Sequence, residues 1–243
     1  MAEYDKIAKE YQESKQLPFR TYIETYTFFQ TLGNIERLNI LDLACGEGFF
    51  TRKLKLAGAA QAYGVDVSAE MIQLAQQIEQ QTTLGCQYAV HDVATMPHLG
   101  EFDVVTAMYL LNYAATKAQL LAFTKAAYAQ LKSGGRFVGF NDNVAADLAT
   151  YHRSKKYGFI KEAPLDRKEG DAIRYTFYNA DGTVFQFNNF YLHPATYDEA
   201  FLEAGFKSFR WVPPQLDPTQ RAQAAYWDDF LRDKPLIGFI AEK

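Results

Sequence analysis

Short, largely apolar segments alternate with helix-like segments along the first 141 residues. Strands without polar alternation are typical of a parallel sheet that is buried on both faces. The expected strands are Asn39–Ala44, Ala62–Val67, Gln87–His91, Phe102–Met108 and Arg136–Phe140. The expected helices are residues 4–13, 19–32, 48–57, 69–81 and 117–131, the last two preceded by the capping residues Ser68 and Thr116. This alternation predicts an α/β fold built from βαβ units.

The pattern changes after residue 141. Ile173–Tyr178 and Val184–Tyr191 alternate along their length and flank a turn-forming segment, Asn179–Thr183. This combination predicts an antiparallel β-hairpin. The hairpin region is too long for a plain connection, so we interpret it as an insertion after the fifth strand. The remaining expected elements are a helix over Ala195–Ala204 and strands over Lys207–Val212 and Leu236–Glu242.

Composition narrows the class of protein. The chain has 243 residues, 48% of them hydrophobic and 22% charged, which fits one globular domain and excludes disorder as the main state. The net charge of -4 argues against nucleic acid as the main partner, because phosphate binding needs clustered Lys and Arg. The sequence has neither the pattern of a signal peptide nor an apolar run of about 20 residues, so we expect a cytoplasmic protein without a membrane partner.

The segment Leu41–Gly48 carries the strongest chemical signal. An acidic residue, Asp42, lies in the predicted strand, and two glycines, Gly46 and Gly48, lie where strand turns into helix. Glycine lets the backbone approach a ligand closely, and the following helix offers unpaired N–H groups. In an open α/β sheet, ligands bind beyond the carboxyl ends of the strands, where the strand order reverses.

Two further acids follow the next strands. Asp66 ends the second strand, about 20 residues after the glycine turn, where an acid can accept both ribose hydroxyls. Asp92 follows the third strand and can accept from an exocyclic amine, while Val93 can offer its backbone N–H. Together with the glycine turn, these residues predict an adenosine site.

This set of residues resembles the class I S-adenosylmethionine-dependent methyltransferases. Asp42–Gly48 is similar to their first motif, Asp66 to their ribose acid and Asp92 to their adenine acid. Leu131–Arg136 is similar to their turn into the fifth strand, and Glu203–Phe206 to the helix end before their last hairpin. The resemblance implies a Rossmann-like, doubly wound, mainly parallel seven-stranded sheet with an antiparallel last strand. It also implies S-adenosylmethionine as cofactor and S-adenosylhomocysteine as product.

The resemblance also implies a division of the chain and a set of binding residues. Residues 1–243 would form one domain: 1–35 an N-terminal helical lid, 36–141 and 194–243 the Rossmann-like core, and 142–193 an insertion that caps the substrate. Gly46 and Gly48 would lie against the methionine part and Met71 near the adenine. The implied cofactor-binding residues are Tyr11, Arg20, Asp42, Ala44, Cys45, Gly46, Gly48, Asp66, Val67, Met71, Asp92, Val93 and Met108.

A closer resemblance lies in the first quarter of the chain. Tyr4–Ala8, Tyr11, Ser14–Lys15 and Pro18–Arg20, taken with Tyr109–Tyr113, are similar to the toxoflavin-biosynthesis type of small-molecule methyltransferase, which N-methylates a flat azapteridine-like heterocycle. By that resemblance Tyr11 and Arg20 close over the cofactor, with Arg20 a candidate partner for its carboxylate. The alternatives are core packing for Tyr11 and a surface salt bridge for Arg20.

Three other classes of protein compete with this interpretation. A nicotinamide-dependent oxidoreductase would need Gly-x-Gly-x-x-Gly, but Thr51 stands at the third glycine position. A nucleic-acid or protein amino-methyltransferase would carry Asp/Asn-Pro-Pro-Tyr after the fourth strand, where this chain has Tyr109–Tyr113. A non-catalytic nucleoside-binding or partner-binding protein on the same scaffold remains the main alternative, because a fold does not establish an activity.

We therefore expect methyl transfer to a small, flat, heteroaromatic or otherwise small-molecule acceptor, on nitrogen or oxygen, in secondary metabolism. The chain would act as a monomer or homodimer, and no metal is expected because its four histidines are scattered. The many aromatic residues of the hairpin either bury it against the sheet or line the acceptor pocket. No general base is identified, and the pocket candidates are Tyr4, Tyr109, Asn112, Tyr113, Asn141 and His193.

Overall fold

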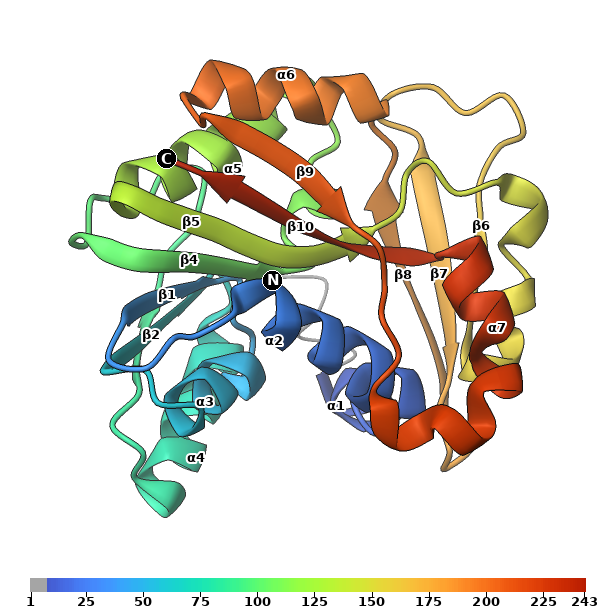
Figure 1. Ribbon diagram of the computed structural model, residues 1–243, viewed down its shortest axis with the longest axis horizontal. Helices are drawn as coiled ribbons and strands as arrows, with labels where there is room; N and C mark the ends of the chain where they lie inside the picture. Colours follow the sequence, from blue (N-terminus) through green and yellow to red (C-terminus); the bar gives the residue numbers. More distant parts are fainter. Residues whose placement is uncertain (1–7) are drawn as a thin grey trace.

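The computed structural model describes residues 8–243, and a seven-stranded sheet lies at its centre. The strand order is β3-β2-β1-β4-β5-β10-β9 (Figure 1). Strands β1 to β5 are parallel, whereas β10 runs antiparallel to both β5 and β9, as the sequence predicted. The bounds are β1 Asn39–Leu43, β2 Gln61–Asp66, β3 Gln87–Val90, β4 Phe102–Met108, β5 Leu131–Asp142, β9 Ser208–Val212 and β10 Leu236–Glu242.

Helices cover both faces of this sheet. Ile40 of β1 packs in a cluster with residues of α2 and α3, while its neighbour Leu41 packs in the larger cluster with residues of α5 and α6. The two residues separate because successive side chains of a strand point to opposite faces. The helices are α1 Ala8–Ser14, α2 Tyr26–Leu32, α3 Phe49–Leu56, α4 Ala69–Thr82, α5 Lys117–Gln130, α6 Pro194–Ala204 and α7 Ala224–Asp233.

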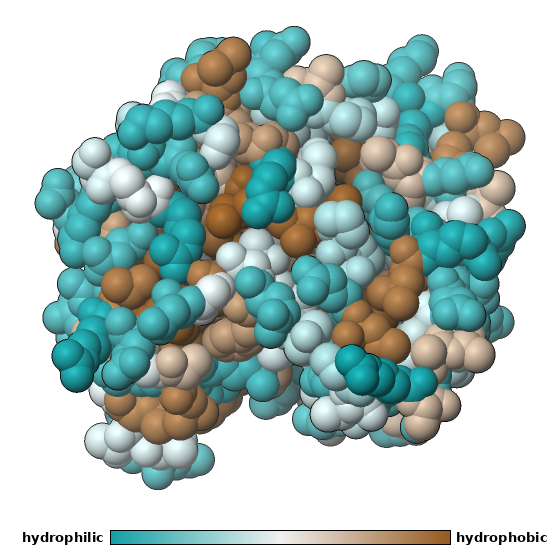
Figure 2. Space-filling view, in the orientation of Figure 1, coloured by the Kyte–Doolittle hydropathy of each residue, from teal (hydrophilic) through white to brown (hydrophobic). Residues whose placement is uncertain are grey.

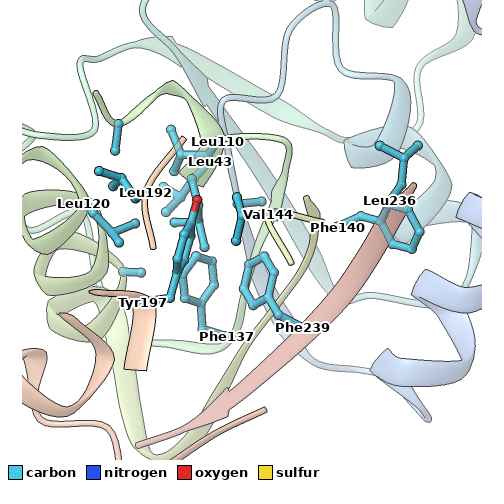
Figure 3. Close-up of a cluster of buried hydrophobic side chains, with 14 of the residues drawn as sticks. Leu43, Leu110, Leu120, Phe137, Phe140, Val144, Leu192, Tyr197, Leu236 and Phe239 are labelled. Carbon is cyan, nitrogen blue, oxygen red and sulfur yellow. The ribbon is translucent and has the colours of Figure 1, made fainter. Parts of the chain in front are cut away.

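The larger hydrophobic cluster extends from the sheet into the insertion. In Figure 3, Phe137 of β5 and Phe239 of β10 lie beside Tyr197 of α6, and the two phenylalanine rings are 5.0 Å apart. The same cluster includes Phe159 and Phe177 of the insertion. Core and insertion therefore share one hydrophobic interior. Hydrophilic residues cover most of the face in Figure 2, with small groups of hydrophobic residues between them.

The insertion forms a three-stranded antiparallel sheet, which we call the lid sheet. Its order is β6-β7-β8, with bounds Phe159–Glu162, Ala172–Tyr178 and Val184–Phe190. The predicted hairpin is β7 and β8, and the third strand, β6, was not expected. Its four residues include Lys161, which is fully buried because it pairs with Asp142 of β5 at 2.8 Å. Because a charged residue occupies a buried position, the hydrophobicity pattern of the sequence does not indicate this strand.

The segment before β1 also differs from the prediction. The single helix expected over residues 19–32 is divided into a π-helix, η2 (Arg20–Thr25), and α2. Short π-helical turns often occur at functional sites, and this one lies next to the cavities described below. Helix α7, which the sequence did not predict, packs against the lid sheet near Phe159, with the Phe230 ring 6.4 Å away. No helix in residues 8–243 is long and apolar enough to cross a membrane.

Candidate active site

A cavity of about 360 Å³ lies at the carboxyl ends of the parallel strands. The chain moves outward from β1 through β2 to β3 and then returns to β4 on the other side of β1, so the strand order reverses there. Ala44, just after β1, and Met108, at the end of β4, line the cavity from the two sides of this reversal. The structure thus places the cavity where an open α/β sheet binds its ligands.

The polar part of this cavity is built around Asp66. Its carboxylate accepts hydrogen bonds from the backbone N–H groups of Gly46 at 2.7 Å and Ser68 at 2.9 Å. Burial raises the pKa of this carboxyl, although both hydrogen bonds oppose the shift. Ser68 also caps α4 by accepting from the N–H of Met71 at 3.2 Å, as predicted. The carboxylate is thereby fixed on the cavity wall.

The rest of the wall is mostly apolar. Met71 and Val93 are buried side chains on the wall, while Val67 and Asp92 are exposed at its edge. Asp92 accepts from the N–H of Ala94 at 2.9 Å. The sequence did not identify His91, Leu110 and Phe123, which also line this cavity. An apolar slot beside a fixed carboxylate suits a flat ring attached to a polyhydroxylated sugar.

The two glycines of the turn are required for different structural reasons. Gly46 has a positive φ of 56°, and a Cβ there would meet nothing within 4 Å, because the glycine faces open space. Gly48 has a φ of 79°, but its Cβ would come within 2.6 Å of the Tyr88 ring. Gly46 lines both the first cavity and a smaller second one. Gly48 lines neither of these two cavities. Glycine is required there because a side chain would collide with Tyr88.

Asp42 occupies a different place from the one predicted. It is 1% exposed and accepts hydrogen bonds from Thr51 Oγ1 at 2.7 Å and Thr106 Oγ1 at 2.9 Å. Burial raises its pKa to about 6. It supports the turn from within and is not among the residues that line the cavities. Cys45 lines a smaller neighbouring cavity, and burial raises the pKa of its thiol, which favours the protonated, weakly nucleophilic form.

The second cavity, of about 50 Å³, lies between the turn and the N-terminal segment. Arg20 Nη1 donates to Glu24 Oε2 at 2.7 Å, and the Tyr109 hydroxyl donates to the same oxygen. Arg20 is 6% exposed, so it forms a buried ion pair and not the surface salt bridge considered as an alternative. Lys15, to which the sequence assigned no binding role, also lines this cavity and pairs with Glu47.

A third cavity, of about 10 Å³, lies between the core and the lid sheet. Aromatic rings make up most of its wall, and one amide side chain, Asn189, joins them. Tyr109 lines all three cavities, Arg20 the second and third, and Tyr113 the first and third. The cavities therefore meet around Tyr109. The residues of the third are Arg20, Tyr109, Tyr113, Tyr175, Phe177, Phe187, Asn189 and Leu236.

The structure brings some of the predicted pocket residues to the site and leaves others away from it. Tyr109 and Tyr113 line cavities, whereas Asn141 is buried below and accepts from the N–H of Asn112 at 3.1 Å. His193 is exposed at the N-cap of α6, where its Nδ1 accepts from the N–H of Ala195, and it lines none of the three cavities.

The predictions for Tyr4 and Tyr11 concern parts of the chain that are not described. Tyr4 lies outside residues 8–243, and Tyr11 lies in α1 with its side chain outside the described part. Among the other expected cofactor residues, ten line the first or second cavity. They are Arg20, Ala44, Cys45, Gly46, Asp66, Val67, Met71, Asp92, Val93 and Met108.

Residues 40–135 match a family model described as "Methyltransferase domain". Within this segment lie the glycine turn, Asp66 and Asp92, the residues on which the sequence prediction depended. These residues therefore carry a methyltransferase domain, which agrees with the predicted class of protein.

Relatives agree with this class. A ubiquinone biosynthesis O-methyltransferase from Coxiella burnetii is 30% identical over 115 residues, which cover 46% of this chain and 47% of that protein. The chain thus spans about half the length of the curated relatives that it matches. Among solved structures, a S-adenosylmethionine-dependent methyltransferase from Clostridium acetobutylicum has a TM-score of 0.66 at 18% identity, with 98% of both chains covered.

A second solved structure contains bound S-adenosylmethionine. The SAM-bound amino pentose methyltransferase from Micromonospora echinaspora, involved in calicheamicin biosynthesis, has a TM-score of 0.54 at 18% identity and covers 100% of this chain and 92% of that one. At these identities the likeness establishes the fold, which is the Rossmann-like methyltransferase fold. The closer resemblance to the toxoflavin-biosynthesis type is not confirmed by these comparisons.

The residues present fit S-adenosylmethionine. Gly46 leaves open space in front of its Cα, the Asp66 carboxylate faces the cavity, and the slot beside it is apolar. The second cavity continues from Gly46 toward the cationic side chains of Lys15 and Arg20. The apolar wall, the carboxylate and the cationic side chains thus follow the order of adenine, ribose and charged methionine end in the cofactor. Binding of this cofactor also agrees with the methyltransferase domain.

Proposed function

We propose that this protein transfers the methyl group of S-adenosylmethionine to a small, flat acceptor that binds under the lid sheet. The observation that carries the proposal is the junction of three cavities at Tyr109. A nucleoside site, a site for a charged chain and an aromatic site share this one side chain. A transferred group would have to pass at such a junction.

The proposal gives each group around the junction a role. Asp66 accepts from the ribose hydroxyls, and Met71 and Val93 enclose the adenine. Lys15 and Arg20 are both candidates for the carboxylate, and each would share its charge with its present partner, Glu47 or Glu24. Arg20 lies 5.2 Å from the Tyr109 ring and 5.4 Å from the Phe177 ring, so it ties the N-terminal segment to both the core and the lid.

The bound cofactor supplies a methyl group already activated by a sulfonium, which leaves with its electron pair on sulfur. The task of the chain is then to align acceptor and methyl, which can supply about 7–11 kcal/mol of the barrier. The apolar walls exclude water from the junction. Where the accepting atom carries a proton, the Tyr109–Glu24 pair offers a route for it, since the hydroxyl donates to the carboxylate.

We infer that the acceptor is heteroaromatic, in keeping with the resemblance to the toxoflavin-biosynthesis type and with a role in secondary metabolism. Stacked rings of the lid sheet support this: the Tyr175 and Phe187 rings are 5.4 Å apart and within 3° of parallel. Such faces accommodate another flat ring well. Nitrogen and oxygen acceptors both remain compatible with this wall.

A methyl-transfer assay tests the proposal. The protein is incubated with methyl-deuterated S-adenosylmethionine and a set of heteroaromatic amines, lactams and phenols, and products are identified by mass spectrometry. We expect a labelled product together with S-adenosylhomocysteine, and loss of both in Asp66→Ala. Label transfer to none of the compounds by a protein that binds the cofactor would contradict the acceptor class. Failure to bind the cofactor would contradict the whole proposal.

A further inference from the structure

Asn189 is a polar residue in an aromatic row. It lies on β8 two residues after Phe187 and four after Phe185, so all three point to the same face of the lid sheet. Its side chain lines the third cavity together with rings of β7 and with Tyr113. The residue is 2% exposed. A leucine would fill this position without bringing a polar group into an apolar wall.

The fold does not use the amide oxygen of the Asn189 side chain. Its Oδ1 is buried and accepts no hydrogen bond from any residue that the structure describes. Burying an amide without compensation costs about 1–3 kcal/mol. Buried polar groups are otherwise almost always paired, so an orphan that faces a cavity indicates a missing partner.

A second amide on a neighbouring element has the same property. Asn112 lies in η3 (Leu111–Tyr113), is fully buried, and neither its Oδ1 nor its Nδ2 has a partner within the described part of the chain. Element η3 packs against β8, and the next residue, Tyr113, lines the third cavity. The two uncompensated amides thus belong to the two elements that border the same site.

We propose that Asn189 selects the acceptor by receiving a hydrogen bond from an N–H or O–H at the edge of its flat ring. This inference rests on the proposed function. The faces of the ring contact Tyr113, Phe177 and Phe187, while Asn189 Oδ1 accepts a hydrogen bond from a donor at its edge. The third cavity, at about 10 Å³, admits only a water-sized molecule in this conformation, so the lid sheet or Arg20 moves when the acceptor enters.

Two variants separate recognition from folding. Asn189→Leu removes the amide and keeps the branched shape of the side chain, and the neighbouring Asn188→Leu makes the same change on the opposite, half-buried face of β8. Because Asn189 Oδ1 has no partner in the free protein, we expect Asn189→Leu to unfold at the same temperature as the parent or higher. A residue with a structural role would show a lower midpoint.

Acceptor binding is measured by titration calorimetry with S-adenosylhomocysteine present. The probes are two pairs of flat rings, in each of which a ring N–H is replaced by a ring oxygen: indole with benzofuran, and quinolin-4(1H)-one with chromone. We expect the parent and Asn188→Leu to bind the N–H member about 5- to 10-fold more tightly. In Asn189→Leu we expect this preference to vanish.

Several results would overturn the inference. Equal binding of both members by the parent would do so, as would binding of none of the four probes, or a preference that survives in Asn189→Leu. A clearly lower unfolding midpoint of free Asn189→Leu would also count against it. Binding of S-adenosylhomocysteine is measured first in all three chains. Its absence from the parent contradicts the proposed function itself, whereas its presence leaves only the role of Asn189 under test.

Discussion

Two buried carboxylates, Asp42 and Asp66, support opposite sides of the glycine turn. Burial raises the pKa of both. Asp42 is enclosed by Thr51 and Thr106, so its oxygens are occupied by the fold. Asp66 holds the turn through Gly46 and still faces the cavity. One acid therefore stabilises the loop and the other can bind a ligand, although both lie in strands or at strand ends of similar sequence character.

Replacement of Asp66 by alanine should weaken binding of S-adenosylhomocysteine by about 1–3 kcal/mol, or about 5- to 150-fold in the dissociation constant. The loss combines missing ribose contacts with unpaired N–H groups at Gly46 and Ser68. Asp92→Ala serves as the comparison, because Asp92 is exposed on the rim and should matter less. Titration calorimetry measures both, and an unchanged constant in Asp66→Ala would remove this residue from the site.

The pH dependence of stability should report on Asp42. Its pKa is about 6 in the folded protein and about 3.9 in an unfolded chain. The folded state therefore holds the proton more tightly, and this contribution to stability is complete below about pH 4 and lost as the pH rises through 6. In Asp42→Asn that loss disappears, so the variant should gain about 3 kcal/mol relative to the parent between pH 4 and 7. Parallel urea-unfolding stabilities across this range would contradict the assignment.

At the scale of elements, a buried ion pair attaches the lid sheet to the core. Lys161 of β6 donates to Asp142 of β5 at 2.8 Å and to the carbonyl of Pro235 at 3.0 Å. The Tyr175 hydroxyl donates to the same carboxylate. Burial lowers the pKa of Lys161, while Asp142 opposes that shift. The pair fixes the side of the lid sheet that lies next to the third cavity, which Tyr175 also lines.

Removal of one partner should be more harmful than removal of both. Lys161→Met leaves Asp142 buried without its counter-charge, and we expect a loss of about 3–5 kcal/mol in the free energy of unfolding. Lys161→Met with Asp142→Asn should recover part of that loss, since no charge then stays buried. Urea unfolding of the parent, both single variants and the double variant gives the coupling. Additive effects would show that the two groups do not depend on each other.

The sequence predicted those elements whose signals are local. The glycine turn, Asp66 and the parallel strands follow from patterns that span a few residues, and the structure has them where expected. Strand β6 escaped because the burial of Lys161 depends on a partner 19 residues away. Glu24 escaped because it becomes part of the site through Tyr109, 85 residues later in the chain. Asn189 could not be distinguished from other polar residues of the hairpin, because the cavity that it lines is formed by residues far apart in the chain.

His193 shows a prediction that the local sequence could have corrected. It precedes Pro194, and proline is favoured at the first position of a helix, so His193 stands where an N-cap residue is expected. The structure uses it in this way, with Nδ1 accepting from Ala195. A residue that ends a turn on the surface in this manner is poorly placed to act on a buried acceptor.

At the scale of the whole molecule, three parts of the chain converge on one junction. The N-terminal segment contributes Arg20 and Glu24, the core contributes Tyr109, and the lid sheet contributes Phe177. Contacts between these parts hold the site closed: Arg20 lies over the rings of both Tyr109 and Phe177. Ligands that fill the junction should therefore stabilise the folded molecule as a unit.

The most direct test is thermal unfolding of the parent protein with S-adenosylmethionine, S-adenosylhomocysteine, NAD and NADP in separate samples. A ligand at about 100 times its dissociation constant adds roughly 2.7 kcal/mol of stability, which raises the midpoint by several degrees in a domain of this size. The account predicts a rise with the two sulfur nucleosides and none with the two nicotinamide nucleotides. A rise with NAD or NADP alone, or no rise with any of the four, would contradict it.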